Sequence, residues 1–300
     1  MNKILVTGAT GFLGKLLVER LRSEHFDVSS VYRGKKDDTV NSVYVQGIDS
    51  KTDWQGKLDG IHCVIHCAAR VHVMNDTASD PLEAFREVNV HGTISLAKAA
   101  SDAGVKRFIF VSTIKVNGEN TSNTSLFHST DAPKPEDPYG VSKSEAETQL
   151  IELGRERSLE VVIIRPPLVY GEGVKANFAL LFKLVGKRIP LPFRAINNNK
   201  RSLVSVYNLI DLIKVCIDHP KAINQIFLIS DDNDITTSDM VALMAKVQGV
   251  NNYSLPFPVW CFNFLGRLLN KQDVVDRLVG SLQVDITHTK KTLNWKPPYS

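Results

Sequence analysis

Tyr139 and Lys143 stand four residues apart in the segment PYGVSKSEAE, and together they could move a proton. In a helix this spacing puts both side chains on one face. An ammonium next to a phenol favours the phenolate, and an unperturbed phenol has a pKa of about 10. A phenol shifted by roughly three units can exchange protons near neutral pH. We therefore predict that Tyr139 is an acid–base group whose pKa Lys143 lowers, although this spacing alone is also frequent by chance.

A hydroxyl group that could hold a substrate oxygen next to Tyr139 stands at the end of an apolar run, KRFIFVS, which is typical of a strand. Ser112 closes this run and Thr113 follows it. From its position in the turn we favour Thr113 and keep Ser112 as the alternative. Either hydroxyl could instead do no more than cap the turn.

The glycine spacing of residues 7–14, TGATGFLG, indicates a loop that binds phosphates. It follows a strand-like run and opens a helix-like one, as a dinucleotide-binding loop requires. The three glycines allow a tight turn, approach of the backbone to a pyrophosphate, and close packing of helix on strand. The helix N-terminus then offers free N–H groups to the phosphates. We predict binding of NAD(H) or NADP(H) through Gly8, Thr10, Gly11, Phe12, Leu13 and Gly14; the alternative is a glycine-rich turn without a ligand.

The end of the second predicted strand bears on the choice between NAD and NADP. A carboxylate there would hold the ribose 2′-hydroxyl of NAD, whereas arginine accommodates the 2′-phosphate of NADP. The strand ends VYRG, so Arg33 favours NADP(H) unless it is only a solvated surface cation. Asp49, after the third predicted strand, could meet the adenine edge. Lys143 could also hold the nicotinamide ribose hydroxyls.

Alternating strand-like and helix-like runs must position these residues. Continuous apolar strands separated by helices are typical of a parallel sheet covered on both faces, so we predict a doubly wound α/β fold of the Rossmann type. One helical stretch is expected from Pro81 to Gly104 and another around residues 139–157. The expected strands are 3–7, 28–32, 43–46, 61–67, 106–112, 161–165 and 225–229.

The regular alternation of strand-like and helix-like runs ends after residue 167, where prolines and asparagines interrupt it. We expect residues 1–167 to form the NAD(P)-binding domain, with residues 205–230 returning to its sheet. Residues 168–204 and 231–300 would form a smaller, interleaved substrate domain. Within it, the apolar segment 255–269 contains prolines, Asn, Gly and Arg, so we expect a buried or lid-forming helix rather than a membrane anchor.

The composition narrows the class of protein. The 300 residues are 43% hydrophobic and 23% charged, which is ordinary for a folded globular chain. The formal net charge is only +4 and the basic residues are scattered, so we expect no nucleic-acid partner. Four cysteines, without a signal-peptide pattern or an apolar run long enough to span a bilayer, predict a cytoplasmic protein without disulfides.

Two further groups of residues could suggest a metal site or a hydrolase site, and we reject both. His62, Cys63, His66 and Cys67 could suggest a metal, but alternate residues of a strand face opposite ways and no second cluster completes four ligands. We therefore expect a buried strand and no metal site. His128 lies in a polar stretch without a nucleophile elbow, so we expect an active-site loop and not a hydrolase.

In combination, the motifs TGATGFLG, IHCAA, VNVHGT, FVSTIKVNG, YGVSK, IIRPPLVYG, RSLVSVYNL and LNWKP resemble the extended short-chain dehydrogenase/reductase family. The likeness covers nearly the whole chain and lies with the branch of nucleotide-sugar epimerases, dehydratases and ketoreductases. It implies a catalytic triad of Thr113, Tyr139 and Lys143. It also implies cofactor contacts from Ala68, Ala69, Asn89 and Pro166, and contacts to the substrate's diphosphate from Asn177 and Arg201, with Arg277 a weaker candidate.

Departures from the family pattern restrict the reaction. The 4,6-dehydratases place Asp-Glu directly after the catalytic Thr, where this chain has Ile114 and Lys115, so dehydration is not expected. The STIKVNGE and RPPLVYGEGVKANF segments are similar to enzymes of bacterial O-antigen synthesis that act at C4 of UDP-N-acetylamino sugars. These comprise 4-ketoreductases that form UDP-N-acetylquinovosamine, and 4-epimerases.

The resemblance therefore implies hydride and proton transfer at C4 of a UDP-(N-acetyl)hexose. Because of Arg33 we lean to an NADPH-dependent 4-ketoreductase; the alternative is a 4-epimerase with tightly bound NAD. Further alternatives are a reductase of a non-sugar carbonyl and a non-catalytic dinucleotide sensor. Family members often pair through two long helices, so we also expect a homodimer.

Overall fold

The computed structural model describes residues 2–34, 41–71, 80–122, 125–174 and 176–299, without the side chains of Ala176, Asn177 and Asp273. Its main feature is a seven-stranded, all-parallel sheet in the order β3-β2-β1-β4-β5-β6-β9. The strands are β1 Lys3–Thr7, β2 Val28–Arg33, β3 Ser42–Val45, β4 Ile61–His66, β5 Arg107–Val111, β6 Glu160–Arg165 and β9 Gln225–Leu228. The doubly wound α/β fold predicted from the sequence is confirmed. The strand order reverses between β1 and β4, and ligands bind at such a point in open α/β sheets.

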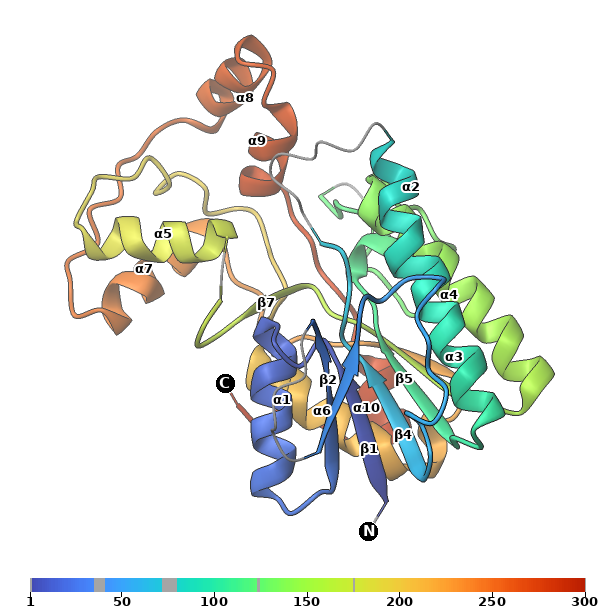
Figure 1. The fold of residues 1–300 in the computed structure, drawn as a ribbon. Coiled ribbons are helices and arrows are strands. Elements are labelled where there is room, and N and C mark those ends of the chain that lie inside the picture. The colour runs from blue at the N-terminus through green and yellow to red at the C-terminus, as the bar shows by residue number, and fades with distance from the viewer. Residues whose placement is uncertain (1, 35–40, 72–79, 123–124, 175, 300) are drawn as a thin grey trace.

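Helices cover both faces of the sheet (Figure 1). One face carries α1 Phe12–Ser23, α6 Val206–Asp218 and α10 Thr287–Leu293; the other carries α2 Pro81–Arg86, α3 Thr93–Asp102 and α4 Pro138–Arg157. Two separate clusters of buried apolar side chains result, one on each side of the strands. This explains why the strands are apolar at successive positions, since neither of their faces meets water.

The helical stretch expected from Pro81 to Gly104 is one continuous rod, but its middle is a π-helical segment, Glu87–Gly92, between α2 and α3. Gly92 allows this segment to approach the turn after β3: a Cβ atom there would lie 2.8 Å from the Ile48 oxygen. Such segments are frequent at functional sites. This one carries Asn89.

The remaining elements lie beyond the carboxyl ends of the strands (Figure 1). They are α5 Ala176–Gly186, α7 Thr237–Val247, α8 Val259–Leu268, α9 Gln272–Val279 and a small parallel sheet of β7 Leu168–Tyr170 and β8 Leu203–Ser205. The division into two interleaved domains stays a prediction. Within it, β9 lies next to β6, whereas Leu293 and Trp295, near the C-terminus, pack in the core on the α1 side of the sheet.

The apolar segment 255–269 does form a helix, α8; of the two expected forms, buried or lid-forming, the structure contradicts the buried one. Gly266 is the buried residue of α8, while Trp260 keeps 69% of its surface exposed. The prediction failed because apolar composition does not show whether a neighbouring element exists to cover it. In the described part of the chain, no helix combines the length and apolarity needed to cross a bilayer.

Candidate active site

The glycine loop lies at the point where the strand order reverses. Gly8 has φ +71°, and a Cβ atom on it would lie 2.8 Å from the Ala68 nitrogen, directly after β4. A Cβ atom on Gly14 would lie 2.2 Å from the Gly8 oxygen, so only glycine lets α1 start this close to the strand. The N-cap, Gly11, provides no side-chain hydrogen bond, and the first turn of α1 has no acid. The N–H groups there are thus suited to a pyrophosphate, and the loop fits a dinucleotide.

Lys143 is buried beneath the carboxyl end of β5. Its Nζ atom donates a 2.8 Å hydrogen bond to the Val111 oxygen and lies 3.7 Å from the centre of the Phe110 ring. Burial lowers the pKa of Lys143 to about 7, although the charges of Glu147 and Cys67 act in the opposite direction. Near neutral pH this amine can therefore exist in either protonation state, which suits a group that passes a proton.

Tyr139 occupies the first turn of α4, where Asp137 caps the helix by accepting a 2.6 Å hydrogen bond from the Gly140 N–H. Its ring packs at 6.2 Å from the ring of Phe85. Burial raises the pKa of Tyr139, and the Asp137 charge raises it further. This is opposite to the lowering predicted from the sequence. Both burial and the neighbouring carboxylate of Asp137 disfavour the phenolate.

The two candidate hydroxyl groups have different surroundings. Ser112 donates a short hydrogen bond to the Glu147 carboxylate. Thr113 caps the short helix Ile114–Val116, and its hydroxyl oxygen accepts a 3.3 Å hydrogen bond from the Lys115 N–H. The Ser112 hydroxyl is thus committed to a buried carboxylate, which supports the preference for Thr113 as the group that meets a substrate.

Asn89 links the cofactor side of the site to the helix of the catalytic pair. Its amide pairs with both backbone groups of Arg70, at 2.8 and 3.0 Å. The same amide donates a 3.0 Å hydrogen bond to the hydroxyl of Ser142, the neighbour of Lys143. Asn89, which the resemblance places among the cofactor contacts, therefore also holds the residue beside Lys143. Ala69 follows Ala68 in the same segment after β4, and the Pro166 oxygen accepts a 2.9 Å hydrogen bond from the Ile114 N–H.

A buried polar network that the sequence analysis did not identify lies under the site. Glu147 and Arg165 form an ion pair in which each side chain is only 3% exposed. Arg165 also donates a 2.9 Å hydrogen bond to Asn117, whose amide donates to the His128 oxygen at 2.8 Å. The available signal was the position of Glu147, one helical turn after Lys143 and two after Tyr139, which puts all three on one face of α4.

Arg201 and Arg277, which are 76 residues apart, lie together. Arg201 donates hydrogen bonds of 2.8 and 3.2 Å to the Arg277 and Gly280 oxygens. Burial, followed by the charge of Arg277, lowers the pKa of Arg201. Two neighbouring guanidinium groups suit a diphosphate, which accepts several charge-assisted hydrogen bonds. The side chain of Asn177, the third predicted contact, lies outside the described residues.

Arg33 and Asp49 are the residues proposed for the adenosine end of the cofactor. Arg33 ends β2 and Asp49 follows β3, as the sequence predicted. Arg33 is exposed at the carboxyl end of β2, next to Val45 of β3. Asp49 shapes its own turn, because its carboxylate accepts 3.0 Å hydrogen bonds from the Lys51 N–H and the Thr52 hydroxyl. Neither observation separates NAD from NADP.

One of the two histidines of the rejected metal cluster, His66, has other partners. His66 lies 2.7 Å from the Thr7 hydroxyl through Nδ1 and 3.0 Å from the Thr93 hydroxyl through Nε2. Burial and the neighbouring Lys143 charge lower its pKa to about 3, so it is neutral. Cys63 packs in the core on the other side of β4. In the described ranges, no three His, Cys, Asp or Glu side chains converge as a metal site would require.

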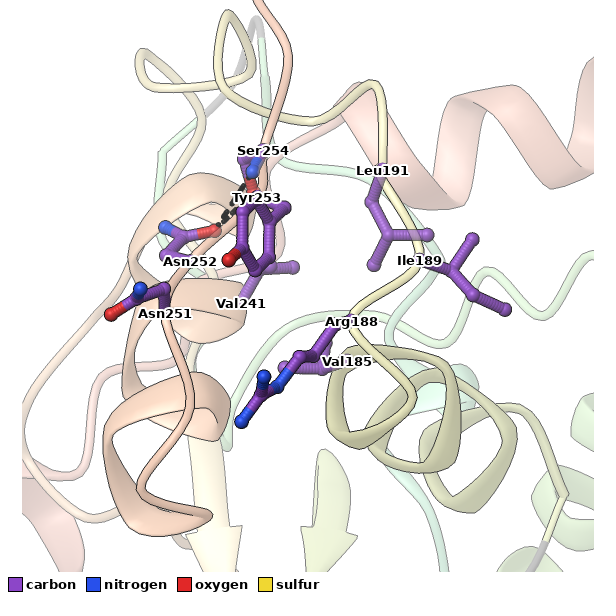
Figure 2. Close-up of a pocket in the computed structure, with 9 residues that line it drawn as sticks. All are labelled: Val185, Arg188, Ile189, Leu191, Val241, Asn251, Asn252, Tyr253 and Ser254. Atoms are coloured by element: carbon purple, nitrogen blue, oxygen red, sulfur yellow. Dashed lines mark hydrogen bonds between the residues drawn. The ribbon is translucent and has the colours of Figure 1, made fainter.

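Two cavities lie between the elements beyond the sheet. One of about 740 Å³ is bounded by α5, α7 and the segment after β7, and its lining includes Tyr170, Phe178, Phe182, Met240, Leu243 and Asp231. This volume is within the range of small-molecule sites. The other, between the end of α5 and residues 251–254, has about 10 Å³ and is too small for a ligand (Figure 2).

The parallel sheet, the glycine loop at its crossover and the Tyr–Lys pair beside it define a Rossmann-type dinucleotide-binding enzyme. The chain belongs to the NAD dependent epimerase/dehydratase family, which matches residues 4–230. It is 54% identical over 299 residues to a Vibrio cholerae protein named UDP-glucose 4-epimerase, an alignment covering 99% of this chain and 91% of that protein. The resemblance deduced from the sequence is confirmed.

Solved structures share the fold. UDP-N-acetylglucosamine 4-epimerase from Bacillus cereus has a TM-score of 0.81 at 19% identity, covering 100% of this chain and 95% of that one. UDP-glucuronic acid 4-epimerase from Bacillus cereus, in complex with NAD, has a TM-score of 0.79 at 21% identity, covering 99% and 94%. Membership of an NAD dependent family supports the predicted nicotinamide dinucleotide as cofactor.

Proposed function

We propose that the protein is a UDP-hexose 4-epimerase that uses bound NAD. The relative of 54% identity, named UDP-glucose 4-epimerase, carries most weight for the reaction. The sequence analysis leaned to a 4-ketoreductase, and the comparisons favour its alternative. The observation that carries the chemistry is the position of Lys143, buried under the end of β5 and one turn after Tyr139.

The surroundings of Lys143 support a position of the pair near the glycine loop. The Lys143 charge acts on His66 and Cys67 at the end of β4, and Ala68, the next residue, contacts Gly8. A reacting sugar carbon next to Tyr139 would therefore be near the ring of a dinucleotide whose pyrophosphate lies at the loop. When bound there, NAD⁺ supplies a hydride acceptor and later donor, together with a positive charge beside the phenol.

The residues of the chain then have separate tasks. Tyr139 accepts the proton of the sugar 4-hydroxyl and returns it to the same oxygen after the keto sugar has turned its other face to the cofactor, with Thr113 hydrogen-bonded to that oxygen. Lys143 holds the ribose hydroxyls of the cofactor and shares the proton with Tyr139. Arg201 and Arg277 bind the diphosphate, which leaves the sugar free to turn. Burial keeps the phenol protonated at neutral pH, and a bound nicotinamide would supply a positive charge that favours the phenolate.

Two assays distinguish the candidate functions. Purified protein incubated with UDP-glucose or UDP-N-acetylglucosamine, without added cofactor, should form the corresponding 4-epimer. A UDP-4-keto sugar supplied with NADPH should cause no net oxidation of NADPH. The reverse result would support the ketoreductase, for which Arg33 at the end of β2 is the favouring observation.

The same assays address the remaining alternatives. Competition by UDP alone is expected for a UDP-sugar enzyme and not for a reductase of non-sugar carbonyls. Absence of turnover on every UDP-sugar, with NAD still bound, would support a dinucleotide sensor. The homodimer and the cytoplasmic location remain part of the proposal.

A further inference from the structure

Helix α8 has its apolar face turned outward. Trp260, Phe264 and Leu268 recur every four residues and are 69%, 61% and 69% exposed. Leu265 and Leu269 widen this stripe, at 42% and 64% exposed. We call these five residues the α8 patch. A helix at the surface of a globular protein normally turns such a stripe toward the core.

The opposite face of α8 contacts the rest of the molecule through half-buried side chains and the buried Gly266. Phe262 stacks on Phe193 with ring centres 6.1 Å apart and meets Phe257 edge-on at 5.3 Å. Gly266 lies against α9, because a Cβ atom there would be 2.7 Å from a methyl group of Val275. The α8 patch is therefore not a core face that has failed to dock. It is held outward.

The segment before α8 is anchored as well. The Leu255 N–H donates a 2.8 Å hydrogen bond to the Leu191 oxygen, and the Arg194 N–H donates to the Leu255 oxygen at 3.2 Å. Figure 2 shows residues 251–254 across from Leu191, which lies in the segment after α5. Figure 1 shows α8 at the end of the molecule away from the amino ends of the strands, where a flat partner could reach it.

The exposed charged residues on α8 and shortly after it are basic, and the next acids along the chain, Asp273 and Asp276, belong to α9. No Asp or Glu occurs from Met240 to Gln272, a stretch that holds Lys246, Arg267 and Lys271. Arg267 and Lys271 are exposed on and directly after α8. Apolar side chains with a tryptophan, flanked by cations, are typical of helices that lie in the interface of an anionic bilayer. A second copy of this face would bring like charges together, which disfavours self-association through it.

We propose that the α8 patch binds the surface of an anionic lipid bilayer and holds the enzyme there as a peripheral protein. Helix α8 would lie along the membrane plane, with the five apolar side chains at the boundary of headgroups and acyl chains. Arg267 and Lys271 would contact the lipid phosphates. The proposal does not depend on which reaction the active site performs.

The test uses the full chain and vesicles of phosphatidylethanolamine with phosphatidylglycerol, compared with phosphatidylcholine alone. The protein should float with the anionic vesicles, less with the neutral ones, and less at high salt. The variant W260E/F264E should reduce the partition coefficient at least about tenfold. The matched control L243E/V247E puts the same charges on exposed residues of α7, at 48% and 77% exposed, and should still float.

The tryptophans provide a second readout. Of the three in the chain, Trp54 and Trp295 are only 4% and 5% exposed, so Trp260 dominates any change of environment. Its emission should shift to the blue with anionic vesicles, and W260F should abolish the shift while retaining most of the binding. R267Q/K271Q should remove the preference for anionic lipid.

Three outcomes would overturn the proposal. These are a wild-type protein that does not float at low salt, equal flotation of W260E/F264E, and a Trp260 emission that does not change. A dimer that W260E/F264E converts to monomer, without vesicle binding by the wild type, would assign the patch to a second copy. The milder variant L268Q is tested in parallel, and its thermal unfolding shows whether the fold is retained.

Discussion

Glu147 and Arg165 form an ion pair in which each side chain keeps only 3% of its surface exposed. Glu147 comes from the helix of the catalytic pair, and Arg165 ends the neighbouring strand β6. Ser112 donates to the same carboxylate, so the pair also fixes the turn that presents Thr113. The geometry of the site therefore depends on this ion pair, which is buried away from solvent.

Removing one partner of this pair should be costly. Glu147→Gln leaves the Arg165 charge buried without a counterion, and the free energy of unfolding should fall by about 3–5 kcal/mol. Glu145→Gln is the matched control on the same helix, since Glu145 and its partner Arg86 are 32% and 36% exposed. That change should cost less than about 1 kcal/mol. Urea unfolding measures both, and similar losses would show that burial of the Glu147 pair does not matter.

Tyr139→Phe should lower kcat by about 10²–10⁴-fold, because a group that transfers the proton in the rate-limiting step is lost. Cofactor binding and thermal unfolding should remain close to wild type. Tyr253→Phe, at an exposed tyrosine, should leave turnover unchanged. Full turnover by Tyr139→Phe would remove the acid–base role from this residue.

Lys143 should make stability depend on pH. Its pKa in the folded protein is about 7, below its ordinary value of 10.5, so between these values the unfolded chain binds more protons. The Lys143 contribution to the free energy of unfolding therefore rises as the pH rises from about 7 toward 10.5. Below pH 7 its penalty is constant, because both states are protonated. Urea unfolding of the cofactor-free protein at several pH values, compared with Lys143→Met, measures this; parallel curves would contradict it.

Gly14→Ala should abolish cofactor binding, because its Cβ atom would lie 2.2 Å from the Gly8 backbone oxygen and α1 would have to move. Titration with NAD(H), followed by fluorescence, gives the affinity. Gly56→Ala is the control: its φ is +68° but the space around it is open. We expect it to cost about 1 kcal/mol of stability and to bind cofactor normally. Normal binding by Gly14→Ala would place the pyrophosphate elsewhere.

Arg277→Gln should weaken the binding of UDP by about tenfold, because one charge-assisted contact to the diphosphate is lost. Calorimetric titration with UDP measures this without requiring turnover. Arg188→Gln, at an exposed arginine beside the 10 Å³ cavity, should bind UDP as the wild type does. An unchanged affinity in Arg277→Gln would leave Arg201 without its proposed partner.

Local patterns in the sequence determined the sheet, the glycine loop and the Tyr139–Lys143 pair. Strand alternation, glycine spacing and the four-residue step along a helix act over a few residues, so they can be recognised before the chain is folded. The resemblance to the family then gave Arg201 and Arg277 a shared role. Their direct contact across 76 residues became visible only in the structure.

Tertiary structure decided what depends on surroundings. The sequence predicted a lowered pKa for Tyr139, but burial raises it, and burial instead lowers that of Lys143. The same limitation applies to α8, for which the sequence left a buried and a lid-forming helix open and whose apolar residues lie at the surface. Desolvation and packing are set by atoms that come from distant parts of the chain, so a local pattern gives the type of a residue without the medium that surrounds it.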